Sequence, residues 1–154
     1  MKKIILFIFI TNFAFSQDMN QVKKLDTVYV LFKKAKKSKR TIYTENFREY
    51  FFYLNSNKNN QQEKLIFSKP DRKNSYTDKN HPIIDTRIEN KSFLKKYKSN
   101  IITADFLRNF NEEYIVCYMF SKSQVFYIID LSEKKRGDIK IYRTFLLNYC
   151  PVSE

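Results

Sequence analysis

Glycine is almost missing from this sequence, since Gly137 is the only one among 154 residues. Phosphate-cradling loops and dinucleotide-binding folds need several glycines, because the backbone must come close to the phosphate groups. The nucleophile elbow of the α/β-hydrolases needs two glycines around its serine. The sequence therefore argues against nucleotide-dependent chemistry and against that type of serine hydrolase, and we expect no cofactor.

Histidine is equally scarce, with His81 as the single example. Zinc sites of the common kind combine several His or Cys ligands, so we expect no metal. His81 lies in a polar segment just before Pro82, which is typical of an exposed loop residue. The functional alternative is a Cys–His pair that activates a thiolate, and this alternative requires Cys117 or Cys150 to be unpaired and close to the imidazole.

Cysteine occurs twice, as Cys117 and Cys150, and the pair forms no CxxC motif. An even number of cysteines in an oxidising compartment favours pairing. Closing a loop of this length stabilises a protein by about 3 to 4 kcal/mol on the chain-entropy argument. One interpretation is a disulfide that fastens the C-terminal tail, and the other is two thiols, with Cys117 serving as a small core residue.

Long hydrophobic runs are absent at the N-terminus as well. Two lysines precede a short apolar run, Ile4–Ile10, and the small residues Ala14 and Ser16 precede a plausible cleavage site. This layout is that of a secretory signal, whereas a membrane-spanning helix needs about 20 apolar residues. We expect residues 1–16 to be a cleaved signal peptide. Residues 17–154 would then be one exported domain, periplasmic or secreted, with no transmembrane segment.

Acidic residues are outnumbered, with 16 Asp and Glu against 29 Lys and Arg and a formal net charge of +13. Such a charge favours anionic partners, although the abundance of Lys, Asn, Ile, Phe and Tyr also fits an A- and T-rich coding sequence. The strongest local feature is a basic run, for which the candidate ligand-binding residues are Lys33, Lys34, Lys36, Lys37, Lys39 and Arg40. A run of this kind either grips an anion or is a solvated loop. We expect an anionic envelope component or a protein partner, and export argues against nucleic acid.

Alternating apolar and β-branched residues predict most of the secondary structure. We expect strands at 25–32, 41–54 with a break at 45–48, 64–68, 82–88, 114–120, 125–131 and 139–147. Two short helices are expected, one capped by Asn90 and one by Thr103. The predicted fold class is α+β, an antiparallel sheet of five or six strands with two short helices and a C-terminal three-strand meander. In the last strand Ile139, Ile141, Phe145 and Leu147 would share one face.

Carboxylates offer the remaining route to catalysis, because two acids at a suitable separation can cleave a glycosidic bond. Asp105 is explained as a first-turn residue of the second helix, and Glu112 and Glu113 as turn residues. Asp130 shares a strand face with apolar residues, and we expect it to form a strand-end salt bridge with Lys or Arg.

The sequence assigns no catalytic residue. We expect a small exported, non-enzymatic binding or interaction protein of the bacterial cell envelope, whose basic surface meets an anionic ligand or partner. The alternatives are a small exported hydrolase that works through carboxylates and an inhibitor of a secreted enzyme.

Overall fold

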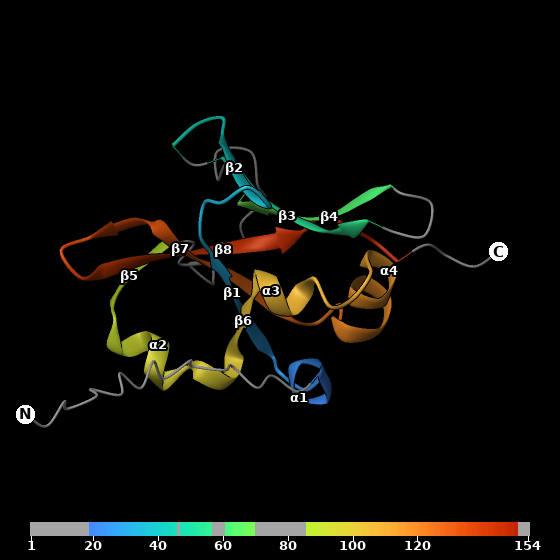
Figure 1. Cartoon of the computed structure of the whole chain (residues 1–154). Helices are drawn as coiled ribbons and strands as arrows, with labels where there is room; N and C mark the ends of the chain where they lie inside the picture. Colours follow the sequence, from blue (N-terminus) through green and yellow to red (C-terminus); the bar gives the residue numbers. More distant parts are fainter. Residues whose placement is uncertain (1–18, 46, 57–60, 70–85, 151–154) are drawn as a thin grey trace, which may run out of the picture.

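A computed structural model describes residues 19–45, 47–56, 61–69 and 86–150 (Figure 1). Within these ranges the strands are β1 (Thr27–Phe32), β2 (Ser38–Ile42), β3 (Arg48–Ser56), β4 (Gln62–Lys69), β5 (Thr86–Asn90), β6 (Ile101–Thr103), β7 (Val125–Lys135) and β8 (Asp138–Leu146). The helices are α1 (Met19–Lys23), α2 (Ser92–Lys96), α3 (Ala104–Leu107) and α4 (Glu112–Tyr114), with a 3₁₀ turn η2 (Lys98–Asn100) and a π-helical segment η3 (Ile115–Met119). The predicted signal peptide, His81 and the first part of the predicted strand 82–88 lie outside the described residues.

The sheet is mixed, so the predicted antiparallel sheet of five or six strands is wrong. Eight strands follow the order β2-β3-β4-β8-β7-β1-β6, with β5 also paired to β8. β1 runs parallel to both of its neighbours, β6 and β7. Both neighbours come from the second half of the chain, and pairing between segments so far apart leaves no local sequence signal.

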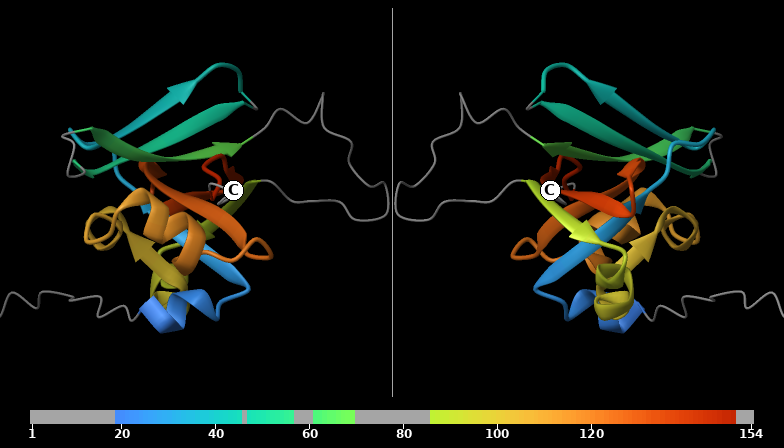
Figure 2. Two further views of the ribbon diagram at one scale, coloured as in Figure 1. Left: turned by 90° about the vertical axis from the view of Figure 1, so that its right-hand side faces the viewer. Right: turned by 90° about the vertical axis from the view of Figure 1, so that its left-hand side faces the viewer.

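Burial on both faces accompanies this parallel pairing, as is usual for parallel strands. Val28, Val30 and Phe32 of β1 point into a large core that also contains side chains of β3, β4 and the helices α1, α3 and α4. Tyr29 on the opposite face packs in a second cluster with Phe93 of α2. The two side views show the layer of β2, β3 and β4 lying across the rest of the molecule (Figure 2).

One strand, β8, joins the two parts of the sheet. Its first edge pairs with β7, and its second edge is shared by β5 at residues 138–142 and by β4 at residues 145–146. Ile139 and Ile141 are buried, whereas Phe145 is 50% and Leu147 49% exposed. The four residues predicted to share one face therefore differ in burial, because the strand leaves one packing environment and enters another along its length.

Local capping signals indicated where two of the helices begin, but the predicted total of two short helices is wrong, because the described ranges contain four. The Thr103 hydroxyl accepts a hydrogen bond from the Phe106 amide at 3.2 Å and begins α3. The Asn90 side chain accepts from the Ser92 amide at 2.8 Å at the start of α2. None of the described helices is long and apolar enough to cross a membrane.

The predicted strand 114–120 is helical. The predicted C-terminal three-strand meander is therefore wrong, because only two of its three segments, β7 and β8, are strands that pair with each other. The Asn111 side chain accepts from the Tyr114 amide at 2.7 Å, and α4 then continues into η3. Ile115 and Met119, four residues apart, are the fully buried residues of η3. The β-branched and aromatic composition that favoured a strand is overridden by this cap and by the helical spacing of the buried residues.

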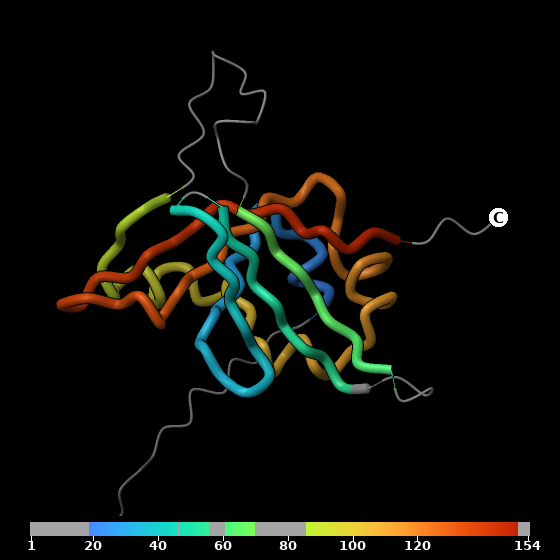
Figure 3. Tube along the Cα trace, turned by 90° about the horizontal axis from the view of Figure 1, so that it is seen from above, coloured from blue at the N-terminus to red at the C-terminus, as the bar shows by residue number. Residues whose placement is uncertain are grey.

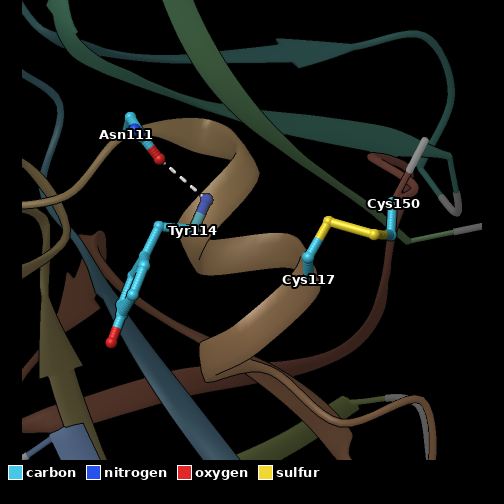
Figure 4. The surroundings of a disulfide bond; sticks show 4 residues. All are labelled: Asn111, Tyr114, Cys117 and Cys150. Carbon is cyan, nitrogen blue, oxygen red and sulfur yellow. Dashed lines mark hydrogen bonds between the residues drawn. A yellow bond between two sulfur atoms is a disulfide. The ribbon is translucent and has the colours of Figure 1, made fainter. Parts of the chain in front are cut away.

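The same segment carries the disulfide. Cys117 of η3 is bonded to Cys150, with 5.0 Å between the two Cα atoms, which is the pairing considered from the sequence (Figure 4). Figure 4 shows Cys117 projecting from the helix toward the chain that leaves β8. The tail after β8 is also held by Asn148, whose side chain accepts from the Ile66 amide at 2.8 Å. The C-terminal tail is thus anchored to both the helical segment and β4.

Candidate functional site

The predicted basic run forms a tight turn at the beginning of β2. Ala35 and Ser38 exchange two backbone hydrogen bonds of 3.1 Å, which places Lys36 and Lys37 at the tip of a two-residue turn. The Lys37 carbonyl accepts from the Tyr53 amide of β3 at 3.0 Å. The exposed lysines of this turn, called the lysine turn below, are Lys33, Lys34, Lys36, Lys37 and Lys39.

The outer face of β2, β3 and β4 continues from the lysine turn. Lys39 Nζ lies 5.6 Å from the ring centroid of Tyr53, and Lys64 Nζ lies 5.8 Å from that of Phe51. Seen from above, no described helix lies over these three strands (Figure 3). This face therefore presents lysines and aromatic rings side by side, an arrangement that favours cation–π contacts.

Arg40, the sixth predicted binding residue, points the other way. Its Nη1 lies 2.5 Å from an Asp130 carboxylate oxygen and 2.7 Å from a Glu133 oxygen, and its side chain is 18% exposed. Residue 40 pairs with Tyr50, whose side chain faces the core. The strand alternation that exposes Lys39 thus directs Arg40 inward, so the structure does not bring Arg40 together with the five lysines.

Asp130 lies fully buried in β7, and both of its carboxylate oxygens accept hydrogen bonds. One oxygen accepts from Arg40 and from the Tyr50 hydroxyl at 3.2 Å. The other accepts from the Ser132 amide at 2.9 Å and hydroxyl at 2.6 Å. The expected salt bridge of Asp130 is confirmed, but its expected place at a strand end is wrong, because β7 continues to Lys135. The pairing satisfies a buried charge that would otherwise be very costly.

Glu133 extends this buried cluster. Its carboxylate forms ion pairs with Arg48 Nη1 at 2.9 Å and with Lys140 Nζ at 3.4 Å, and it accepts a hydrogen bond from the Tyr142 hydroxyl. Burial pushes the pKa of Glu133 upward, but the Tyr142 hydrogen bond and the cations outweigh it, and the pKa lies below its ordinary value. Burial also raises the pKa of Tyr142, and the hydrogen bond to Glu133 raises it further. The cluster joins β2 and β3 to β7 and β8, and both of its acids are occupied by cations, so it is structural.

The other carboxylates singled out from the sequence have structural roles as well. Asp105 lies in the first turn of α3 and pairs with Arg108 at 2.5 Å. Glu112 and Glu113 line a hollow of about 310 Å³ together with Glu63 of β4. Glu63 accepts from the Glu112 amide at 2.8 Å, and Glu112 accepts from the Asn148 side chain at 2.8 Å. Two of the three acids in this hollow, Glu63 and Glu112, therefore fasten α4 to its neighbours.

A second hollow was not predicted. It measures about 340 Å³ and lies between η3, the start of β7, the end of β8 and Cys150. Its lining comes from segments far apart in the sequence, so no single stretch of sequence indicated it. Among the described residues, no group of three or more His, Cys, Asp or Glu side chains is arranged to hold a metal ion.

No protein-family model matches the chain, and neither a curated protein nor a solved structure is significantly similar to it.

Proposed function

We propose that this chain is an exported, non-enzymatic binding protein of the cell envelope that holds an anionic ligand or partner on the lysine turn. The observation that supports this proposal is the gathering of five exposed lysines on one short turn. None of the five forms an ion pair with a carboxylate in the described part of the chain. Their charges are therefore available to an incoming anion.

The turn is held in place before any ligand arrives. Backbone hydrogen bonds close it at Ala35 and Ser38, and the Lys37 carbonyl is fixed to Tyr53. Ordering of the backbone is thus largely complete in the free protein, which reduces the entropic cost of binding. Removal of residues 1–16 takes away Lys2 and Lys3 and no acidic residue, so the formal net charge falls from +13 to +11 (13 − 2) and still adds long-range attraction for an anion.

Export is part of the proposal, and two features support it. The N-terminal sequence has the layout of a secretory signal. The disulfide between Cys117 and Cys150 fits an oxidising compartment. Because an exported protein meets the cell envelope, we propose that the ligand is an anionic envelope component.

The test is retention of the purified chain on an immobilised anionic polymer over a salt gradient. In one variant all five lysines of the turn are replaced by Gln. In a matched control five other exposed lysines are replaced, namely Lys23, Lys24, Lys91, Lys95 and Lys135. We expect the turn variant to elute at clearly lower salt than the control, although both variants lose the same charge.

Equal elution of the two variants would contradict the proposal, since it would show that only bulk charge matters.

Arg40 provides a further comparison, because it belongs to the buried cluster. We expect Arg40→Gln to lower the free energy of unfolding by about 3 to 5 kcal/mol, the cost of leaving a buried partner unpaired. Its elution should stay close to that of the unaltered protein.

A further inference from the structure

The hollow beside the disulfide has apolar walls. Its apolar lining residues are Val116, Phe120, Val125, Phe126, Phe145 and Leu146. Its volume of about 340 Å³ lies at the lower end of the range of about 300 to 1,000 Å³ that is typical of small-molecule sites. The hollow is therefore suited to a small, mainly apolar ligand.

The charged residues that line the hollow are cations. Arg143 and Lys122 line it, and no Asp or Glu of the described ranges does. Arg143 is half-buried and has no carboxylate within ion-pair distance in the described ranges. Its guanidinium lies 6.0 Å from the ring centroid of Phe145. An arginine that is held partly out of water, and that has no carboxylate partner among the described residues, is complementary to an anionic group.

The neighbouring polar side chains are already engaged. The Gln124 amide donates to the carbonyls of Val22 and Leu25, both at 2.8 Å. Its side-chain oxygen accepts from the Ser121 amide at 2.9 Å. These bonds shape the wall of the hollow and leave Arg143 and Lys122 as the groups that would meet a ligand's charge.

We propose that this hollow binds a single-chain amphiphile with an anionic head group. The chain would lie against Val116, Phe120 and Phe126, and the head group would meet Arg143 and Lys122. A volume of about 340 Å³ corresponds to about eleven non-hydrogen atoms at the ~30 Å³ that each water takes in the liquid. This site shares no residue with the lysine turn and does not depend on the function proposed above.

The experiment is isothermal titration calorimetry of the full chain with octanoate, with octan-1-ol as the uncharged probe. Saturable octanoate binding, at least tenfold tighter than octanol binding, is the expected result. Octyl phosphate in a third titration distinguishes a phosphate from a carboxylate head group. Octanoate that fails to saturate, or that binds no better than octanol, would overturn the proposal.

Three substitutions locate the site. Arg143→Gln should weaken octanoate binding at least tenfold and leave octanol binding within about twofold, whereas Arg143→Lys should retain most of the preference for octanoate. Arg87→Gln is the matched control, because Arg87 also lies over an aromatic ring, 4.9 Å from that of Tyr127, and does not line the hollow. An equal loss in Arg87→Gln and Arg143→Gln would overturn the proposal.

Val116→Trp tests the same hollow without changing an arginine, in case the arginine variants fold poorly. The larger side chain would fill the hollow and should abolish binding of both probes, and the thermal unfolding midpoint shows whether the fold is retained. Unchanged octanoate binding in a folded Val116→Trp variant would place the ligand elsewhere and refute the assignment.

Discussion

Lys39 and Arg40 are neighbours in the sequence and have opposite surroundings. Lys39 is exposed beside Tyr53, whereas Arg40 is held between Asp130 and Glu133. The sequence of the basic run could not show which of the two faces the core, because a run of like charges has no alternation of polar and apolar residues. The start of β2 at Ser38 decides which of the two faces the core. One buried arginine thus contributes to stability, while its neighbour is available to a ligand.

The lowered pKa of Glu133 leads to a prediction for stability against pH. Burial raises this pKa, but hydrogen bonding by Tyr142 and the charges of Arg48 and Arg40 lower it more. A folded-state pKa below the unfolded value of about 4.3 gives stability that is present above that pH and is lost as pH falls through the folded pKa. We expect Glu133→Gln to be less stable than the unaltered protein at pH 7, with a difference that shrinks below about pH 4.

Urea unfolding between about pH 3 and pH 7 measures this difference. Asp138→Asn serves as the comparison, since Asp138 is an exposed carboxylate at the start of β8. A stability difference between Glu133→Gln and the unaltered protein that is the same at every pH would argue against the assigned role of Glu133.

At the scale of elements, α4 and the η3 segment that follows it begin at a side-chain cap. The Asn111 oxygen accepts from the Tyr114 amide at 2.7 Å (Figure 4). Asn111→Ala should therefore reduce the free energy of unfolding by about 1 kcal/mol. Asn111→Asp, which keeps the acceptor, should cost much less.

Asn109→Ala is the matched control for this cap, because Asn109 is an exposed asparagine two residues earlier. Urea denaturation curves of the three variants give the comparison. A loss in Asn109→Ala as large as that in Asn111→Ala would mean that the cap contributes no specific stability.

Elements with local signals were predictable from the sequence, and those defined by distant pairing were not. Thr103 and Asn90 begin helices as expected, and the arginine–glycine turn at 136–137 separates β7 from β8. The segment 114–120 was predicted wrongly because aromatic and β-branched residues also occur in buried helices. The cap at Asn111 and the spacing of Ile115 and Met119 were the available signals. Parallel pairing of β1 had none, since it arises between residues brought together only by the complete fold.

The candidate sites also differ in how local their sequence signals are. The lysine turn comes from one contiguous basic run, and five of the six cations predicted in that run are exposed. The hollow near Arg143 is built from η3, β7, β8 and the tail. No single segment contains enough of the lining residues for the hollow to be predicted from the sequence.

For the molecule as a whole, the disulfide is the covalent link between η3 and the C-terminal tail. Cys117 and Cys150 are 33 residues apart, and a loop of this length predicts a loss of about 3 to 4 kcal/mol when both are replaced by Ser. Urea unfolding of the double variant measures this loss, and the unaltered protein with a reducing agent is the matched comparison. Equal unfolding midpoints with and without the disulfide would contradict the prediction.

The sheet ends at β2, whose outer edge has no described partner strand. An open edge can template the addition of a strand from another molecule, and lysines on such an edge discourage this association. Lys36, Lys37 and Lys39 stand at this border. The residues that we propose to attract a ligand would therefore also keep neighbouring copies from stacking edge to edge, so a lysine-depleted variant should be handled at low concentration and checked by light scattering.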